Sequence, residues 1–134
     1  MIQLITGKKG TGKTKILIDL INKEAKQTKG YLVCIEKGAK LTYDIDHRVR
    51  LADVEHYHID SYEKFYGFVA GMLAGNYDIM EIFVDSILKI GGSDLDKLGE
   101  VLDELEKLAS TNVKLVFTVS ADPSEMPDSV KKYL

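Results

Sequence analysis

"GKKGTGKT", residues 7–14, lies between the short apolar run "IQLIT" (2–6) and the helix-like segment "KILIDLI" (15–21). Its three glycines weaken any helix or strand, and its three lysines repel one another. We therefore expect a bound partner to offset the weakened secondary structure and the repulsion between the lysines. The stretch therefore predicts a binding loop at a junction between a strand and a helix.

The spacing of four residues in this stretch indicates what the loop binds. Gly7, Gly12, Lys13 and Thr14 match the pattern G-x-x-x-x-G-K-[ST], with a predicted strand before it and a predicted helix after it. Glycines let successive N–H groups point into one concavity at the positive end of the helix, which suits a polyphosphate. Lys13 would reach the β- and γ-phosphates, and the Thr14 hydroxyl would ligate Mg²⁺. The alternative is a glycine-rich turn with a chance lysine and threonine, and random residue frequencies make such a match rare.

The residues predicted to bind the phosphates form one continuous segment, residues 7–15. They are Gly7, Lys8, Lys9, Gly10, Thr11, Gly12, Lys13, Thr14 and Lys15.

A carboxylate for the metal ion follows the apolar run "MEIFV" (80–84). Asp85 falls where this predicted strand stops, and α/β sheets build ligand sites at the carboxyl ends of their strands. We expect Asp85 to hold Mg²⁺ through water, beside Thr14. The alternative is a carboxylate that only caps or ends a strand.

Short apolar runs alternate with helix-like segments along the chain. Runs rich in β-branched and aromatic residues predict strands at 2–6, 31–36, 54–59, 80–85 and 114–120. Helical spacing of apolar residues predicts helices at 13–27, 62–75, 94–110 and 124–134. Asp60 or Ser61, and Ser93 or Asp94, would cap the second and third of these helices.

This alternation predicts an α/β fold, because parallel neighbouring strands need right-handed crossovers that place helices on the faces of the sheet. We expect a three-layer α/β/α sandwich with a mainly parallel five-stranded sheet, in one domain spanning residues 1–134. Residues 37–53 show no clear period, and they are predicted to form an exposed loop near the ligand.

Composition limits the classes of function. The chain has 134 residues, 45% hydrophobic and 29% charged, and its apolar runs are far shorter than the roughly 20 residues needed to cross a bilayer. The N-terminus lacks the features of a signal peptide, so we expect a soluble, cytoplasmic protein.

Net charge is −3 and only Arg48 and Arg50 are arginines, so nucleic acid is not indicated as a partner. Cys34 is predicted to be a small buried residue of a strand.

With both motifs placed, the chain resembles the P-loop NTPases, specifically the RecA-like ATPases of the KaiC and RadA type. "IFVDSI" (82–87) resembles that group's strand ending in Asp-Ser, and "YLVCIEKG" (31–38) resembles its second strand, which ends in a water-activating carboxylate. Residues 58–86 resemble the strand, capped helix and Asp-bearing strand of the group. "NVKLVFTVSAD" (112–122) resembles the next strand, whose polar end lies near the γ-phosphate.

The resemblance implies further roles and a sheet order. Glu36 becomes the candidate general base and Ser120 the candidate γ-phosphate sensor, beside Lys13 as a catalytic lysine. The alternative for Glu36 is an exposed glutamate that ends a strand. The implied order of strands is 54–59, 31–36, 80–85, 114–120 and 2–6.

The chain also departs from the pattern of that group, whose full ATPases add a cation from a neighbouring subunit, an adenine-clamping segment and DNA-binding loops. Such a cation raises the rate of phosphoryl transfer by several orders of magnitude. Because none is evident here, we expect slow turnover or activation by assembly. Candidate cations acting on another copy are Lys131, Lys132, Arg48 and Arg50.

"EHYHID" (55–60) raises the question of a second metal site. His56, His58 and Asp60 alternate, and they would share one face of the predicted strand 54–59. Three ligands on one strand would spread further than a zinc ion spans, so a solvated or helix-covered edge strand is the favoured interpretation.

These observations predict a protein that binds ATP with Mg²⁺ and hydrolyses it slowly or on stimulation by a partner. The alternative is a nucleotide-responsive regulatory module that binds ATP or ADP without significant hydrolysis. A small-molecule kinase is disfavoured, because such kinases usually use lid arginines and no arginine follows Arg50. The absence of an N-K-x-D motif favours adenine over guanine. A homo-oligomer or a protein partner stays open.

Overall fold

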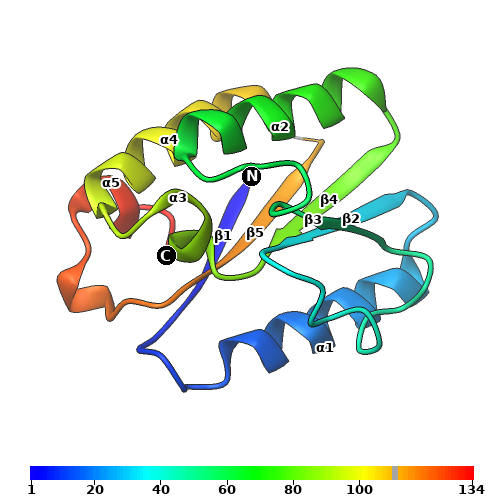
Figure 1. Ribbon diagram of the computed structural model, residues 1–134, viewed down its shortest axis with the longest axis horizontal. Helices are drawn as coiled ribbons and strands as arrows, with labels where there is room; N and C mark the ends of the chain where they lie inside the picture. The colour runs from blue at the N-terminus through cyan, green and yellow to red at the C-terminus, as the bar shows by residue number, and fades with distance from the viewer. Residues whose placement is uncertain (110–111) are drawn as a thin grey trace.

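In the computed structural model, which describes residues 1–109 and 112–134, five strands form a single sheet. They are β1 (Ile2–Thr6), β2 (Tyr31–Glu36), β3 (Arg50–Asp53), β4 (Ile79–Val84) and β5 (Lys114–Val119). Their order across the sheet is β1-β5-β4-β2-β3, and every neighbouring pair is parallel (Figure 1). The carboxyl ends of all five strands therefore lie along the same edge of the sheet.

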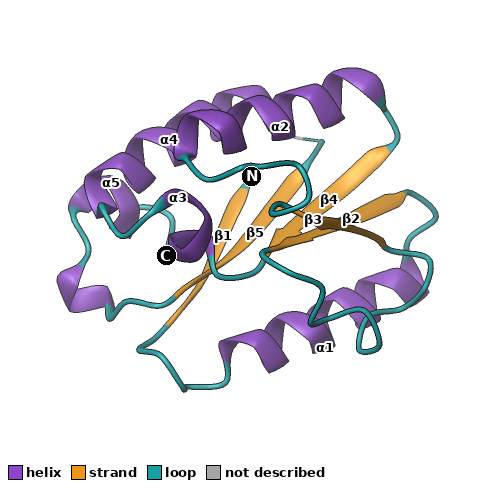
Figure 2. Ribbon diagram, in the orientation of Figure 1, coloured by secondary structure: helices purple, strands orange, loops and turns teal. Residues whose placement is uncertain are grey.

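Helices cover both faces of the sheet, as expected for an α/β fold (Figure 2). The helical elements are α1 (Lys13–Gln27), α2 (Tyr62–Gly75), α3 (Ile87–Gly91), α4 (Leu95–Ala109), the 3₁₀ turn η1 (Pro123–Glu125) and α5 (Asp128–Lys131). Figure 1 shows α1 on one face and α2, α3, α4 and α5 on the other. Among the described residues, no helix has the length and apolar character needed to span a membrane.

The core forms on both faces because alternate residues of a strand point to opposite sides. In β2, Leu32 and Cys34 pack in the cluster of α1, whereas Val33 and Ile35 pack in the cluster that contains α2 and α4. Cys34 is fully buried, which confirms its predicted place in a strand, and burial raises the pKa of its thiol to about 12. The sheet thus carries near-continuous apolar runs, as expected for parallel strands covered on both faces.

The predicted strand at 54–59 is wrong, because β3 occupies that edge of the sheet and the chain turns immediately after it. The Val54 N–H donates to the Glu36 carbonyl at 2.9 Å, and the Ile59 N–H then donates back to the Val54 carbonyl at 2.9 Å. His58 adopts a left-handed conformation with φ of 57° to close this turn. The segment has the composition of a strand, but the buried Val54 and Ile59 anchor both ends of a turn whose intervening residues face solvent.

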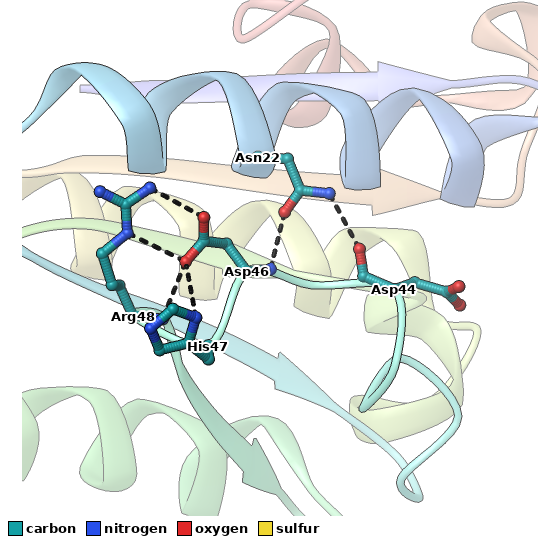
Figure 3. Close-up of polar contacts among 5 residues, drawn as sticks. All are labelled: Asn22, Asp44, Asp46, His47 and Arg48. Carbon is teal, nitrogen blue, oxygen red and sulfur yellow. Dashed lines mark hydrogen bonds and ion pairs between the residues drawn. The ribbon is translucent and has the colours of Figure 1, made fainter.

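The irregular connection between β2 and β3 is residues 37–49, shorter than the predicted 37–53, and Asn22 of α1 fastens it (Figure 3). The Asn22 side-chain amide donates to the Asp44 carbonyl at 2.8 Å and accepts from the Asp46 N–H at 2.8 Å. Asp46 accepts two hydrogen bonds from the Arg48 guanidinium, at 3.0 and 2.8 Å, which hold the pKa of its carboxyl well below the usual range. This loop is therefore built into the fold by specific polar contacts.

Helix α1 has its predicted bounds, and α2 begins after Ser61, whose hydroxyl oxygen accepts from the Lys64 N–H at 3.2 Å. Asp94 caps α4 in the same way, and position 110 of the third predicted helix lies outside the described residues. The last predicted helix is interrupted at Pro127, which lacks an N–H and forces the preceding Met126 into an extended conformation. The short helix α3 was not predicted.

Two helical glycines allow a test of how tightly the helices pack. A Cβ added at Gly99 of α4 would lie 2.8 Å from the Ser129 Cβ of α5, whereas one added at Gly67 of α2 would meet nothing within 4 Å. We expect Gly67→Ala to raise the free energy of unfolding by about 0.5–1 kcal/mol, because alanine loses less backbone entropy in a helix. Gly99→Ala should lower it, because α5 must shift. Urea unfolding of both variants tests this; stabilisation by Gly99→Ala would show that α5 is not packed as described.

Candidate functional site

The loop between β1 and α1 curls because its glycines adopt conformations that other residues rarely take. Gly12, the residue before α1, has a left-handed conformation with φ of 83°. A Cβ at Gly7 would lie 2.6 Å from the Thr11 hydroxyl oxygen, so the two sides of the loop approach closely only because position 7 is glycine. The Gly7 N–H donates to the Ala121 carbonyl at 3.2 Å, which ties the start of the loop to the segment after β5.

Lys13 folds back beneath this loop. Its side chain is only 7% exposed, and its ammonium donates to the Lys8 carbonyl at 2.8 Å and to the Thr11 hydroxyl oxygen at 3.3 Å. The Thr11 hydroxyl itself donates to the Lys8 carbonyl at 2.7 Å. None of the ion pairs among the described residues involves Lys13, so its positive charge is held by neutral oxygens and lacks a counter-charge.

The first turn of α1 adds to this positive potential. It has no side-chain cap and contains no acidic residue. The N–H groups of a helix start carry a partial positive charge when nothing caps them, and they bind anions readily. The loop, the buried ammonium and the helix terminus therefore form one electropositive site.

Three side chains that carry oxygen atoms form a hydrogen-bonded group beside the start of α1. The Thr14 hydroxyl is 3.2 and 3.4 Å from the two Asp85 carboxylate oxygens, at the end of β4. The Thr118 hydroxyl, from β5, donates to Asp85 Oδ1 at 2.8 Å and accepts from the Ser86 N–H at 2.6 Å. These contacts bring together residues more than 30 positions apart in the chain, and they orient the Asp85 carboxylate toward Thr14.

The oxygens of Thr14 and Asp85 are the kind of ligand that Mg²⁺ prefers, and a magnesium ion at a phosphate site takes few protein ligands, with substrate oxygens and water completing its coordination. The two residues fit that role. Among the described residues, no group of three or more His, Cys, Asp or Glu side chains is placed to hold a metal ion by itself. His56 and His58 lie in the turn after β3 rather than on one face of a strand.

A cavity of about 370 Å³ joins these elements. Its lining comes from the loop and the start of α1, from the turn after β4 together with α3, and from β5 with the residue after it. The lining residues are Lys9, Gly10, Gly12, Lys13, Thr14, Ser86, Leu88, Lys89, Thr118 and Ser120. Ser120 is therefore brought to the same cavity as the loop. A larger groove of about 830 Å³, which both arginines line, lies along the β3 edge of the sheet.

Glu36 is placed differently from the other candidate residues. It is 4% exposed, does not line this cavity, and its two carboxylate oxygens accept from the N–H groups of Lys40 and Leu41, at 3.2 and 3.0 Å. Burial raises the pKa of its carboxyl, and the negative charges of Asp85 and Asp53 add to the shift. In this structure Glu36 therefore caps the loop that follows β2, and it is not the exposed glutamate of the alternative interpretation.

Three residues of the site were missed by the sequence analysis. Thr118 is 1% exposed, and its signal was a single hydroxyl inside the apolar strand "KLVFTV". Ser86 has a left-handed conformation with φ of 57°, rare for a residue with a side chain, and no local pattern indicates it. Lys89 lines the cavity only because the unpredicted helix α3 begins directly after β4.

Comparison of the sequence with protein-family models and with curated proteins gives no match. The resemblance to P-loop NTPases noted from the sequence motifs therefore stays a prediction.

Thr118 provides a test of the polar group beside α1. Thr118→Val keeps the shape of the side chain but leaves the partly buried Ser86 N–H without its acceptor, and it removes one of the two hydroxyls that donate to Asp85. We expect the free energy of unfolding to fall by about 1–3 kcal/mol. Thr118→Ser keeps the hydroxyl, loses one methyl group and should be the more stable variant. Urea unfolding of both compares them; a valine variant as stable as the serine variant would contradict the described contacts.

Proposed function

We propose that this chain is a P-loop protein that binds ATP together with Mg²⁺ and hydrolyses it slowly or on stimulation by a partner. The observation that carries the proposal is the Lys13 ammonium, which neutral oxygens hold at an uncapped helix start near the Thr14–Asp85 pair, and which is in none of the ion pairs among the described residues. A polyphosphate would supply the missing negative charge. The Mg²⁺ ion would join the same site through oxygen ligands.

Each residue has a definable task in this proposal. The loop N–H groups and Lys13 bind and orient the phosphates, and the Thr14 hydroxyl and the Asp85 carboxylate hold the metal ion. Thr118 keeps the Asp85 carboxylate directed toward Thr14. Bound Mg²⁺ supplies positive charge that offsets the charge developing between the β- and γ-phosphates. Ser120 lines the cavity, from which its hydroxyl can donate to a terminal phosphate.

The placement of Glu36 favours slow hydrolysis. A general base must come within hydrogen-bond reach of the attacking water, directly or through one further water. Both Glu36 oxygens accept backbone hydrogen bonds from the loop after β2, so positioning a water competes with that cap. The same observation favours the second candidate function, a nucleotide-responsive module that binds ATP or ADP without significant hydrolysis.

Nucleotide titration tests the binding step. We expect ATP to bind with Mg²⁺, and Lys13→Ala to weaken that binding at least about tenfold, because a charged hydrogen-bond donor to the phosphates is lost. In the wild type we expect a higher affinity for ATP with Mg²⁺ than with EDTA, and Thr14→Ala should abolish most of that difference in affinity. Lys23→Ala, an exposed lysine of α1 away from the cavity, is the matched control. Isothermal titration calorimetry with ATP, ADP and GTP measures these values; wild-type protein that binds none of them at millimolar concentration would refute the proposal.

A phosphate-release assay separates the two candidate functions. If Glu36 positions the attacking water, Glu36→Gln should lower the rate by about 10²-fold or more while nucleotide affinity is kept. Glu100→Gln, an exposed glutamate of α4, controls for the change of charge. Turnover that is equal in the wild type and in Glu36→Gln would remove Glu36 from the mechanism and favour the regulatory module. A rate that rises faster than protein concentration would indicate activation by assembly.

A further inference from the structure

The cavity at the phosphate loop has an unusual balance of charge. Three lysines line it, Lys9, Lys13 and Lys89, and no carboxylate does so among the described residues. Lys9 and Lys13 belong to the loop and to α1, whereas Lys89 belongs to α3. Figure 1 places α1 and α3 on opposite faces of the sheet, at the edge where the strands end. The lysines that line the cavity therefore come from elements on both faces of the sheet.

Lys13 and Lys89 differ in the contacts that their side chains already make. The Lys13 ammonium is held by oxygens of the loop. Lys89 is exposed, and none of the ion pairs among the described residues involves it. Lys89 also lines an adjoining cavity of about 420 Å³ that contains Glu55 and His58. Its side chain thus has space on both sides and is available to a ligand.

The backbone before Lys89 determines this position. Ser86 turns the chain out of β4 with its left-handed φ of 57°, and the Lys89 N–H donates to the Ser86 carbonyl at 2.9 Å. Lys89 therefore lies one turn after the residue whose own N–H is bound to Thr118. The same strand end that carries Asp85 fixes the start of α3 and so the location of Lys89.

We propose that Lys89 is the residue that distinguishes a nucleoside triphosphate from a diphosphate at this site. The inference rests on the proposed function, in which loop amides and Lys13 bind the phosphates and the Ser120 hydroxyl can donate to the terminal one. The terminal phosphate also adds negative charge, which Lys89 meets from the α3 side of the cavity. A diphosphate leaves Lys89 without that contact.

Three of the four cations considered from the sequence are placed elsewhere in this chain. Arg48 pairs with Asp46 at 2.8 Å, and Lys132 pairs with Asp103 at 2.8 Å. Arg50 lines the groove along β3 and not the phosphate-loop cavity. Lys89 therefore supplies, within one chain, a positive charge that was expected only from a neighbouring copy.

The test compares ATP with ADP, each with Mg²⁺, by calorimetry. We expect Lys89→Ala to weaken ATP binding at least about tenfold while ADP affinity changes by less than about twofold. Lys89→Arg, which keeps the charge, should retain most of the preference for ATP. Lys97→Ala is the matched control, because Lys97 is an exposed lysine of α4 that lines a different cavity.

The outcomes separate this inference from the function on which it rests. Wild-type protein that binds neither nucleotide would overturn both. Wild-type binding with an unchanged ratio of ATP to ADP affinity in Lys89→Ala would overturn the inference alone, as would an equal loss of both affinities. A selective loss of ATP affinity, restored by arginine, supports it.

Discussion

The parallel alignment of β1, β5 and β4 is the constraint on which the whole site depends. Thr6 pairs with Val119 and Val84 pairs with Phe117, so the loop after Thr6, the carboxylate after Val84 and the hydroxyl of Thr118 reach the same edge together. A slip of one residue in β5 would turn Thr118 to the opposite face of the sheet and remove one of the two hydroxyls that donate to Asp85. The apolar residues that fill both faces of these strands fix the register, and so the core positions the polar group.

The loop and its flanking elements could be predicted because their signals are local. Glycine spacing, a preceding apolar run and a following helical period all lie within residues 2–27, and the observed β1 and α1 have the predicted bounds. Asp85 was found by its place at the end of an apolar strand. Its place beside Thr14 was predicted as well, whereas its hydrogen bond to Thr118 was not, because that contact depends on the register of β4 and β5, which no local pattern contains.

The wrong and missing predictions have physical causes of their own. The β-branched and aromatic residues of 54–59 predicted a strand, although Val54 and Ile59 anchor a turn through one hydrogen bond between their own backbones. Helix α3 is five residues long, too short for periodicity to reveal, so Lys89 was not recognised. The predicted metal, substrate and catalytic roles concern ligands, and they stay predictions that the experiments address.

The single side chain of Asn22 couples two parts of the molecule that are separate in the chain. Both halves of its amide bind the 37–49 segment, which Glu36 also holds at the end of β2. Strand β3 follows directly from this segment and forms one edge of the sheet. Loss of the Asn22 amide would therefore loosen the link between α1 and this edge strand.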